Sequence, residues 1–382
     1  MIAKPFHLIV VVLSGLVLAS CAVKPPVDRS IGLTRGDLLD DVAFGVTVQD
    51  QVASVDLLGV NEDMRAFLHK HAPDHLAPER KVDQILTAIL RDGLILEYDS
   101  FQTFSAEEAF YSRQGNCLSF TNLFVALARE AGLKVEYQEV EVPPNWERRG
   151  NSYLYNRHIN ALVHLPFGAT KAVDFDIAEF DIDYPRKRIT DNYATAQYYN
   201  NVAIYWLDQD ELKPAYLNLR KAIDLYPNAP YFWTNLGSLY HHSGDDVRAE
   251  ASWLEALKLG DEPSAISNLA RLYRRKNEEL LATWYEQDAE KHRRRNPFYL
   301  YDLGDTAYDD GNYLEAVSVL KKAVRLREGE HEFYRLLGLS YLQLGEKKSA
   351  LHSFYRAEQA ADGKAMRRKY NEKQRLLVQV AH

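Results

Sequence analysis

The chain of 382 residues has only two cysteines, Cys21 and Cys117, and this excludes the framework of disulfides on which many small exported domains depend. Long apolar runs are equally scarce. The stretch of that kind at residues 8–18 is shorter than the roughly 20 residues that a membrane-spanning helix needs. Positive charge is not in excess, since 46 Lys and Arg face 54 Asp and Glu. The resulting net charge of −8 argues against nucleic acid as a partner.

The first twenty residues have the pattern of an export signal, with a basic start and then the apolar run. Leu18-Ala19-Ser20-Cys21 follows and resembles the bacterial lipobox, in which the chain is cut before a cysteine that is then acylated. Ala22 resembles the residue found after that cysteine in lipoproteins of the outer membrane. We therefore expect a signal peptide at 1–20, a lipid such as palmitate on Cys21, and a tether at 21–46. The protein would be anchored to the outer membrane, facing the periplasm.

Cys117 lies where a glycine-containing turn changes into an amphipathic helix. Apolar residues recur at three- and four-residue steps from Phe120 to Ala131, the period of one buried helical face, and Gly132 supplies the left-handed residue that closes many helices. Cys117 therefore opens the helix, where unpaired N–H groups and the positive end of the dipole favour a thiolate. The alternative is a small buried side chain, which describes most free cysteines.

An alternating apolar pattern follows this helix and predicts three strands, at residues 134–142, 153–165 and 171–177. Pro143-Pro144 is expected to end the first strand, and 145–151 to form a polar loop. His158 lies on one face of the second strand, and Asp174 and Asp176 share a face of the third. A helix-opening cysteine, a strand histidine and an aspartate form the general set of nucleophile, base and orienting group.

The motif R-x-G-x-C opening an apolar helix that ends R-x-x-G-L, a histidine about 40 residues later and V-D after a further 16 resemble the transglutaminase-like superfamily over about residues 80–190. The resemblance implies a papain-like core, a helix packed on an antiparallel sheet, with Cys117 as nucleophile, His158 as base and Asp174 as orienting group. Two positions depart from the family. Asn160 stands where the family often has tryptophan, and D-F-D replaces D-P-T, which leaves Asp174 and Asp176 as alternatives.

Other polar residues of this region have weaker patterns. His164 shares a face with the predicted base and is interpreted as a structural histidine. Gln114 lies three residues before the nucleophile and could help to bind an oxyanion, although the backbone N–H of the nucleophile can serve. His69, His71 and His75 cluster, but no cysteine or H-x-x-x-H helix accompanies them. We expect no metal and no cofactor.

The C-terminal half repeats itself in blocks that begin near residues 196, 230, 263, 297 and 331. Small residues recur at fixed offsets, and the eighth positions are Ala203, Gly237, Ala270, Gly304 and Gly338. Such residues let the two helices of one repeat approach closely. The pattern resembles tetratricopeptide repeats. We expect an all-α solenoid of five repeats at 196–363 and a polar capping helix at 364–382, after a transglutaminase-like domain at 47–192.

Repeat arrays of this kind present a concave face lined by the first helix of each pair. The sixth positions of four successive repeats are Asn201, Asn235, Asn268 and Asp302. Side-chain amides there can hydrogen-bond a peptide backbone whatever its sequence, and Arg271 and Arg274 add positive charge. These residues predict a groove that grips an extended, acidic polypeptide. The alternative is asparagines that bind nothing and solvated arginines, as we interpret Lys291–Arg295 (K-H-R-R-R).

The sequence leaves two alternative functions. In the first, an outer-membrane lipoprotein uses Cys117, His158 and Asp174 to cleave a peptide or isopeptide bond through an acyl-thioester, and the repeats bind a protein partner or substrate. An amine acceptor in place of water would make it a transglutaminase, but many bacterial relatives of this fold resemble proteases, which favours hydrolysis. In the second, the triad fold is inert and the repeats scaffold an envelope complex.

Overall fold

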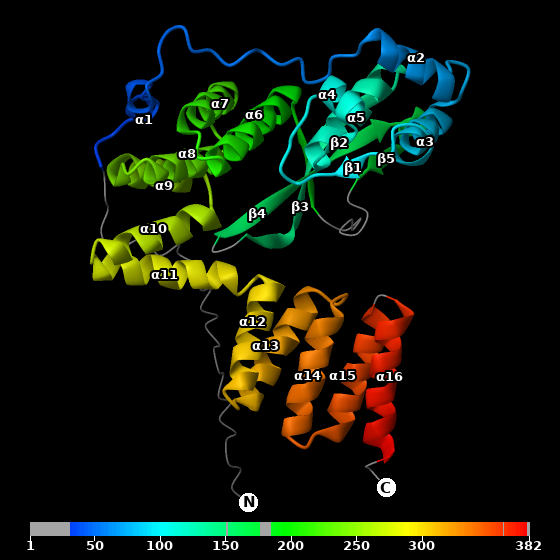
Figure 1. The fold of residues 1–382 in the computed structure, drawn as a ribbon, viewed down its shortest axis with the longest axis vertical. Helices are drawn as coiled ribbons and strands as arrows, with labels where there is room; N and C mark the ends of the chain where they lie inside the picture. The colour runs from blue at the N-terminus through cyan, green and yellow to red at the C-terminus, as the bar shows by residue number, and fades with distance from the viewer. Residues whose placement is uncertain (1–30, 150–151, 176–184, 362, 380–382) are drawn as a thin grey trace, which may run out of the picture.

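The computed structural model describes residues 31–149, 152–175, 185–361 and 363–379 (Figure 1). The predicted signal peptide, Cys21 and Asp176 lie outside these residues. An α+β part comes first along the chain and is followed by a run of helix pairs (Figure 1), which confirms the predicted fold class. None of the helices in the described residues combines the length and apolarity needed to cross a bilayer.

The α+β part is built on one antiparallel sheet and a row of helices. Its elements are α2 (Glu62–His71), α3 (Pro78–Thr87), the π-helical turn η2 (Ala88–Asp92), β1 (Glu97–Tyr98), α4 (Ala106–Ser112), β2 (Gln114–Gly115), α5 (Cys117–Glu130), β3 (Lys134–Arg149), β4 (Ser152–His164), the short turn η3 (Pro166–Gly168), β5 (Thr170–Val173) and β6 (Arg186–Ile189). The strands β5-β4-β3-β6 form the main sheet in that order, and β1 and β2 form a separate parallel pair.

Helix α5 is the centre of this part, as its apolar period predicted. Leu123, Phe124 and Leu127 are fully buried, and the helix packs against β3 and β4. Burying each such side chain contributes about 1.5–3 kcal/mol. The helix begins at Cys117, after the N-cap Asn116, and it is followed by Gly132 at φ +82°, the left-handed conformation predicted for that glycine.

Strand β3 runs further than the sequence indicated. The prolines 143–144 were expected to end it, but it continues to Arg149, and Asn145–Arg149 pair with residues 152–156 of β4. The register shifts between Val140 and Asn145, so the prolines lie at an irregularity of the ladder. A proline is tolerated there because no regular ladder hydrogen bond is lost. The polar loop predicted at 145–151 is therefore wrong for residues 145–149.

Helix pairs fill the C-terminal half within the described residues. They are α6 (Asp191–Asp208) with α7 (Leu212–Leu225), α8 (Pro230–His242) with α9 (Asp246–Leu259), α10 (Pro263–Arg275) with α11 (Glu279–Arg293), α12 (Pro297–Asp309) with α13 (Tyr313–Leu326) and α14 (His331–Gln343) with α15 (Lys347–Ala360), and α16 (Lys364–Gln379) follows. A Cβ atom on Gly237 would lie 2.5 Å from Nε1 of Trp253 on the facing helix. The small eighth residue is therefore required for the two helices to pack, as predicted.

The hydrophobic core divides between α11 and α12. One continuous cluster joins the α+β part to helices α6–α11 and extends to Ala289, whereas helices from α12 onward are built around separate clusters that begin at Leu300. Figure 1 shows the chain changing direction at this point, with α12–α16 standing beside one another below the rest. The first three repeats are thus fused to the α+β part, and the last two form a unit of their own.

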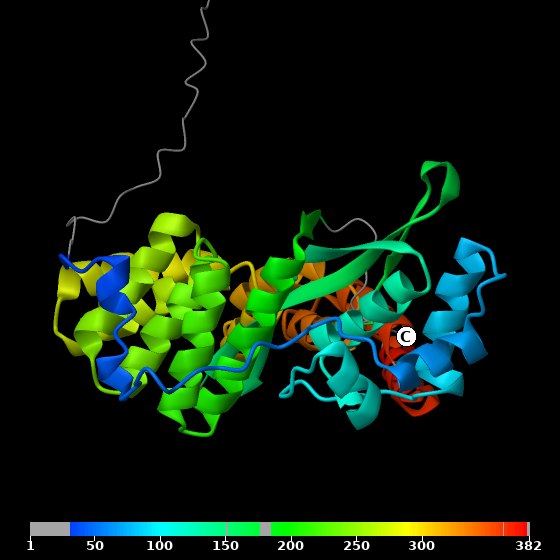
Figure 2. The same ribbon diagram turned by 90° about the horizontal axis from the view of Figure 1, so that it is seen from above.

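Residues 34–55, here called the N-terminal strap, differ from the free tether predicted for 21–46. The strap contains α1 (Arg35–Leu38) and the 3-10 turn η1 (Val42–Phe44) and runs along the helices of the first repeats before reaching α2 (Figures 1 and 2). Phe44 is buried and its ring stacks on that of Tyr216, with the centroids 4.5 Å apart. The hydroxyl of Tyr240 donates to the carbonyl of Leu38 at 2.8 Å.

Ion pairs hold the strap along its length. Nε of Arg35 lies 2.6 Å from Oε1 of Glu255, and Asp40 and Asp41 pair with Arg248 and Arg220. Sequence patterns gave no sign of these contacts because the partners are roughly two hundred residues apart in the chain. The strap is therefore part of the folded structure.

Candidate active site

Cys117 occupies the first turn of α5, where the sequence predicted it. The side chain of Asn116 caps the helix by accepting a hydrogen bond from the backbone N–H of Ser119 at 3.1 Å. Cys117 is half-buried and is a free thiol. The positive end of the helix dipole and the unpaired N–H groups of the first turn give this position a positive local field. The residue is thus exposed enough to react and lies in a field that suits a nucleophile.

His158 and Asp174 meet beside this cysteine. They lie on β4 and just beyond β5, which are neighbouring strands of the sheet. Nε2 of His158 is 2.7 Å from Oδ2 and 2.8 Å from Oδ1 of Asp174. The two side chains are only 9% and 5% exposed, so solvent screens their attraction little. With Nε2 bonded to the carboxylate, Nδ1 is the ring nitrogen left for the sulfur.

The environment of His158 strongly favours its protonated form. Burial on its own lowers the pKa of the imidazole, but hydrogen bonds and charge interactions with Asp174 and Cys117 outweigh burial and raise the pKa from 6.5 to about 10. Cys117 is near enough to the ring to contribute to this shift. Of the three residues that the sequence proposed as a triad, the structure pairs the histidine with the aspartate by hydrogen bonds and places the cysteine near that pair.

Asn160 explains one departure from the family pattern. It lies two residues after the histidine on the same face of β4, is fully buried, and donates through Nδ2 to Oδ2 of Asp174 at 2.9 Å. The imidazole and the amide both donate hydrogen bonds to this carboxylate, which helps to hold it in one orientation. In the sequence, Asn160 was notable only because it replaces a tryptophan that the family often has. Its place two residues after the base, on the same strand face, was the signal that could have identified it.

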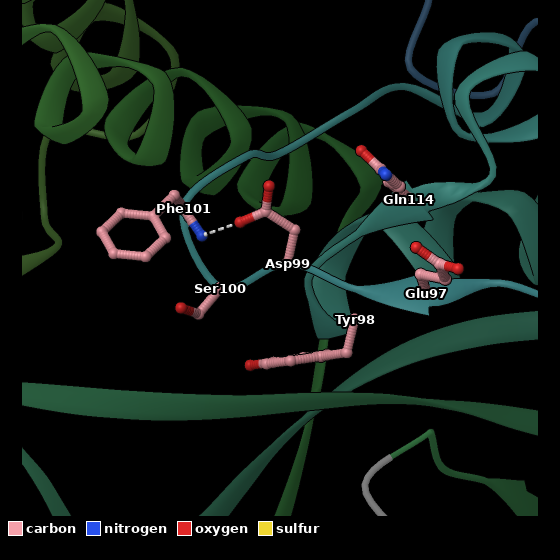
Figure 3. A pocket seen from close by; sticks show the side chains of 6 residues that line it. All are labelled: Glu97, Tyr98, Asp99, Ser100, Phe101 and Gln114. Atoms are coloured by element: carbon pink, nitrogen blue, oxygen red, sulfur yellow. Dashed lines mark hydrogen bonds between the residues drawn. The ribbon is translucent and has the colours of Figure 1, made fainter.

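Tyr98 is a further neighbour of the nucleophile. It ends β1, opposite Gly115 of β2, and its hydroxyl lies 4.0 Å from Sγ of Cys117. The loop around it lines a pocket with Glu97, Asp99, Ser100, Phe101 and Gln114 (Figure 3). In that view Tyr98 projects to one side of the loop, and Asp99 and Gln114 project to the other. Sequence patterns gave no sign of Tyr98, because a two-residue strand has no measurable period.

Comparison with known families identifies the kind of domain that contains this site. Residues 70–175 match the transglutaminase-like superfamily, and residues 218–251 and 301–365 match tetratricopeptide-repeat families. The chain carries a transglutaminase-like domain followed by tetratricopeptide repeats. Among curated proteins, none matches this chain.

The chain is also similar, over about half of its length, to several solved structures. YrrB, described as a TPR protein with an unusual peptide-binding site, is 20% identical over 46% of this chain and 92% of its own, with a TM-score of 0.25. MamA from Desulfovibrio magneticus RS-1 is 20% identical over 46% of this chain and 99% of its own, with a TM-score of 0.25. PilF of Pseudomonas aeruginosa is 14% identical over 49% of this chain and 89% of its own, with a TM-score of 0.30.

Two polar residues near the triad of the transglutaminase-like domain lie apart from it. Nε2 of His164 is 2.8 Å from Oε2 of Glu136 on β3, so this histidine bridges two strands rather than facing the sulfur. Gln114 is exposed and lines the pocket on the side of the loop away from Tyr98. No group of three or more His, Cys, Asp and Glu within the described ranges is placed to hold a metal ion.

The asparagines that were predicted to line the groove of the tetratricopeptide array make hydrogen bonds within the protein. Asn235 donates to Oδ1 of Asn200 at 2.7 Å, and Asn200 in turn contacts Asn201, so the amides of the first two repeats are linked. Asn268 donates to Ser238 at 3.3 Å and accepts from Arg271 at 2.5 Å.

Arg274 and Asp302 differ from the expected arrangement. Arg274 forms ion pairs with Glu279 and Glu286 of the following helix, which neutralise its charge. Asp302 lies on α12, beyond the division of the core. The predicted ladder is therefore divided between two units, and its first three positions belong to the unit fused to the transglutaminase-like domain.

Proposed function

We propose that the chain is a cysteine hydrolase that cleaves a peptide or isopeptide bond through an acyl-thioester. The observation that carries the proposal is the buried contact of His158 with Asp174 beside a half-buried Cys117 at a helix N-terminus. The carboxylate orients the imidazole, and a nucleophile near such a pair is the arrangement that thiol catalysis needs.

The residues suggest the following steps. The thiolate of Cys117 attacks the carbonyl carbon, and the carbonyl π electrons move to oxygen to give an oxyanion, which the backbone N–H of Cys117 can bind. As the tetrahedral intermediate collapses, the C–N bond breaks and the imidazolium of His158 gives its proton to the leaving amine. Water, deprotonated by the neutral imidazole, then attacks the thioester; the C–S bond breaks to release the acid and the thiolate, and the imidazole keeps the proton taken from water. Asp174 holds the ring in place throughout.

The raised pKa of His158 keeps the resting ring in its protonated form. At neutral pH the ring is protonated, because its pKa is about 10, and can therefore serve as the acid of the first half-reaction. The proposal predicts that acylation declines as the pH rises through about 10, where the proton is lost.

Thiol labelling tests this proposal and separates it from an inert fold. The chain, its Cys117→Ala variant and its His158→Ala variant, each also carrying Cys21→Ala so that residue 21 cannot react, would be treated with an iodoacetamide fluorophore across the pH range 5–11. We expect pH-dependent labelling of wild type, none of Cys117→Ala, and a strong loss in His158→Ala. His164→Ala is the matched control, since that ring binds Glu136 and should leave labelling unchanged. If His158→Ala is labelled as strongly as wild type, the result would favour the second candidate, a protein-interaction scaffold, which the repeat array supports on its own.

We further propose that Cys21 is acylated and anchors the protein to the outer membrane, facing the periplasm. The support is the signal-like sequence that ends in Leu18-Ala19-Ser20-Cys21. Metabolic labelling with a palmitate analogue tests it: Cys21→Ala should lose the label and leave the membrane fraction. Retention of the label in that variant would contradict the proposal.

The first three repeats are proposed to bind an acidic, extended polypeptide through Asn235, Asn268 and Arg271. Burial together with the nearby Arg275 and Arg293 lowers the pKa of Arg271, the sign of a crowded positive site that an anion would relieve. Binding of fluorescent poly-glutamate would be measured at low salt. Arg271→Ala should weaken it severalfold, whereas the matched variant Arg274→Ala should not, because glutamates of the protein already neutralise that residue. Equal effects of the two variants would contradict a groove at this position.

A further inference from the structure

The hydroxyl of Tyr98 stands close to the place where an oxyanion would form. It lies 4.0 Å from Sγ of Cys117 and belongs to an element, β1, that is held against β2 directly before the nucleophile. Hydrogen bonds from the backbone of Glu97 to the carbonyl of Arg113, and of Asp99 to that of Gly115, fix β1 in this position.

The ring of Tyr98 is positioned by the residues of the triad helix and strand. Its edge packs on Phe120 of α5 with centroids 6.4 Å apart, and Phe120 packs on Phe175, the residue after Asp174, at 5.9 Å. This chain of aromatic contacts links the tyrosine to the elements that carry the nucleophile and the orienting carboxylate. Tyr98 is 63% exposed, and its edge-to-face contact with Phe120 is a geometry that aromatic pairs prefer.

The backbone that carries Tyr98 is unusual as well. Ile95, three residues earlier, has φ +57°, a left-handed conformation that a β-branched side chain rarely adopts, and it follows a π-helical turn. Arg113 next to β2 also has φ +57°. A residue held in this region costs about 1–3 kcal/mol and is found mainly at functional sites. The two left-handed residues precede the two short strands that bring Tyr98 to the sulfur.

We propose that the phenolic O–H of Tyr98 is a catalytic hydrogen-bond donor to the oxyanion, acting beside the backbone N–H of Cys117. This inference rests on the proposed thiol chemistry. The oxyanion oxygen is bonded to the carbon that the sulfur attacks, so a donor 4.0 Å from the sulfur can lie within about 2.7–3.1 Å of that oxygen. Tyr98 keeps its proton: it strengthens a hydrogen bond as the carbonyl becomes an oxyanion and weakens it when the thioester forms. Gln114, the side chain that the sequence suggested for this role, lies on the other side of the loop (Figure 3).

Two reagents that attack the same sulfur by different routes test the proposal. p-Nitrophenyl acetate acylates a thiolate through a tetrahedral oxyanion, whereas iodoacetamide alkylates it by direct displacement, without an oxyanion. Rates of both reactions at Cys117 would be compared in the full chain for wild type, Tyr98→Phe and Tyr111→Phe. Tyr111 is an exposed tyrosine of the same domain whose hydroxyl donates to Asp63, so it controls for loss of a phenol elsewhere.

The proposal expects Tyr98→Phe to slow acylation on the order of 10²-fold, the cost of losing one oxyanion donor, and to leave alkylation and its pH profile unchanged. Tyr111→Phe should change neither rate. An unchanged acylation rate in Tyr98→Phe would overturn the proposal, as would an equal loss in both reactions, which would mean that the phenol only stabilises the thiolate. If wild type reacts with neither reagent faster than a free thiol, the proposed hydrolase itself fails, and this outcome is distinct from the other two.

Discussion

Removing the charge of Asp174 tests the electrostatics of the site most directly. The pKa of His158, raised from 6.5 to about 10, corresponds to a preference for the imidazolium of about 5 kcal/mol, at 1.36 kcal/mol per unit. Burial opposes this preference, and Asp174 is the larger of the two groups that create it. In Asp174→Asn only Cys117 would oppose the effect of burial. We therefore expect the pKa of His158 to fall by about 2 units or more, which is about 3 kcal/mol.

Proton NMR of the chain with labelled histidines would follow the C2 proton of His158, assigned by its absence in His158→Gln. Glu136→Gln is the matched control, because that carboxylate pairs with His164 and should leave His158 unchanged. Because the folded-state pKa is raised, the stability that the pair contributes is complete below pH 6.5 and is lost as the pH rises to about 10. A His158 that titrates at the same pH in Asp174→Asn would refute the reasoning, and a fall seen only in Asp176→Asn would make Asp176 the orienting group.

Three further substitutions have defined outcomes. Asn160→Ala should slow thiol labelling roughly tenfold or more, since a hydrogen bond to a charged group contributes about 1.5–3 kcal/mol; an unchanged rate would show that the amide does not support the triad. Phe44→Ala should lower the free energy of unfolding by about 3 kcal/mol in denaturant titrations, whereas the exposed Val42→Ala should have almost no effect; equal effects would mean that the strap is not docked in solution. Gly237→Ala should cost about 1–3 kcal/mol in the same titrations, because the new Cβ meets Trp253, and an unaltered midpoint would contradict the close helix packing.

Local patterns predicted much of the fold. The period of apolar residues after Cys117 marked α5, and the second to fifth helix pairs begin at residues 230, 263, 297 and 331, the block starts given by the spacing of small residues. These signals work because each helix or repeat unit buries a face that its own sequence encodes. The order histidine, aspartate in neighbouring strands likewise anticipated two side chains that hydrogen-bond each other, His158 and Asp174.

The structural features that the sequence did not predict depend on contacts between residues that are far apart in the chain. The strap was predicted to be a tether because its short helices have no apolar period and its anchors, such as Tyr240, are about two hundred residues away. Pro143-Pro144 predicted a break, but an irregular ladder accommodates both prolines. The role proposed for Tyr98 depends on the distance between its hydroxyl and Sγ of Cys117, which no sequence pattern reveals.

The docked strap also decides how force would travel through the molecule. A pull on the N-terminus is transmitted first to Glu255, Arg248 and Arg220 on the repeats, through the side chains of Arg35, Asp40 and Asp41, and only afterwards to the domain that bears the thiol. A fully extended chain from Cys21 to Thr34 spans at most about 45 Å. If Cys21 is fixed in a bilayer, the early repeats stand next to the lipid surface. The nucleophile belongs to a domain beyond the contacts of the strap and is therefore shielded from mechanical load.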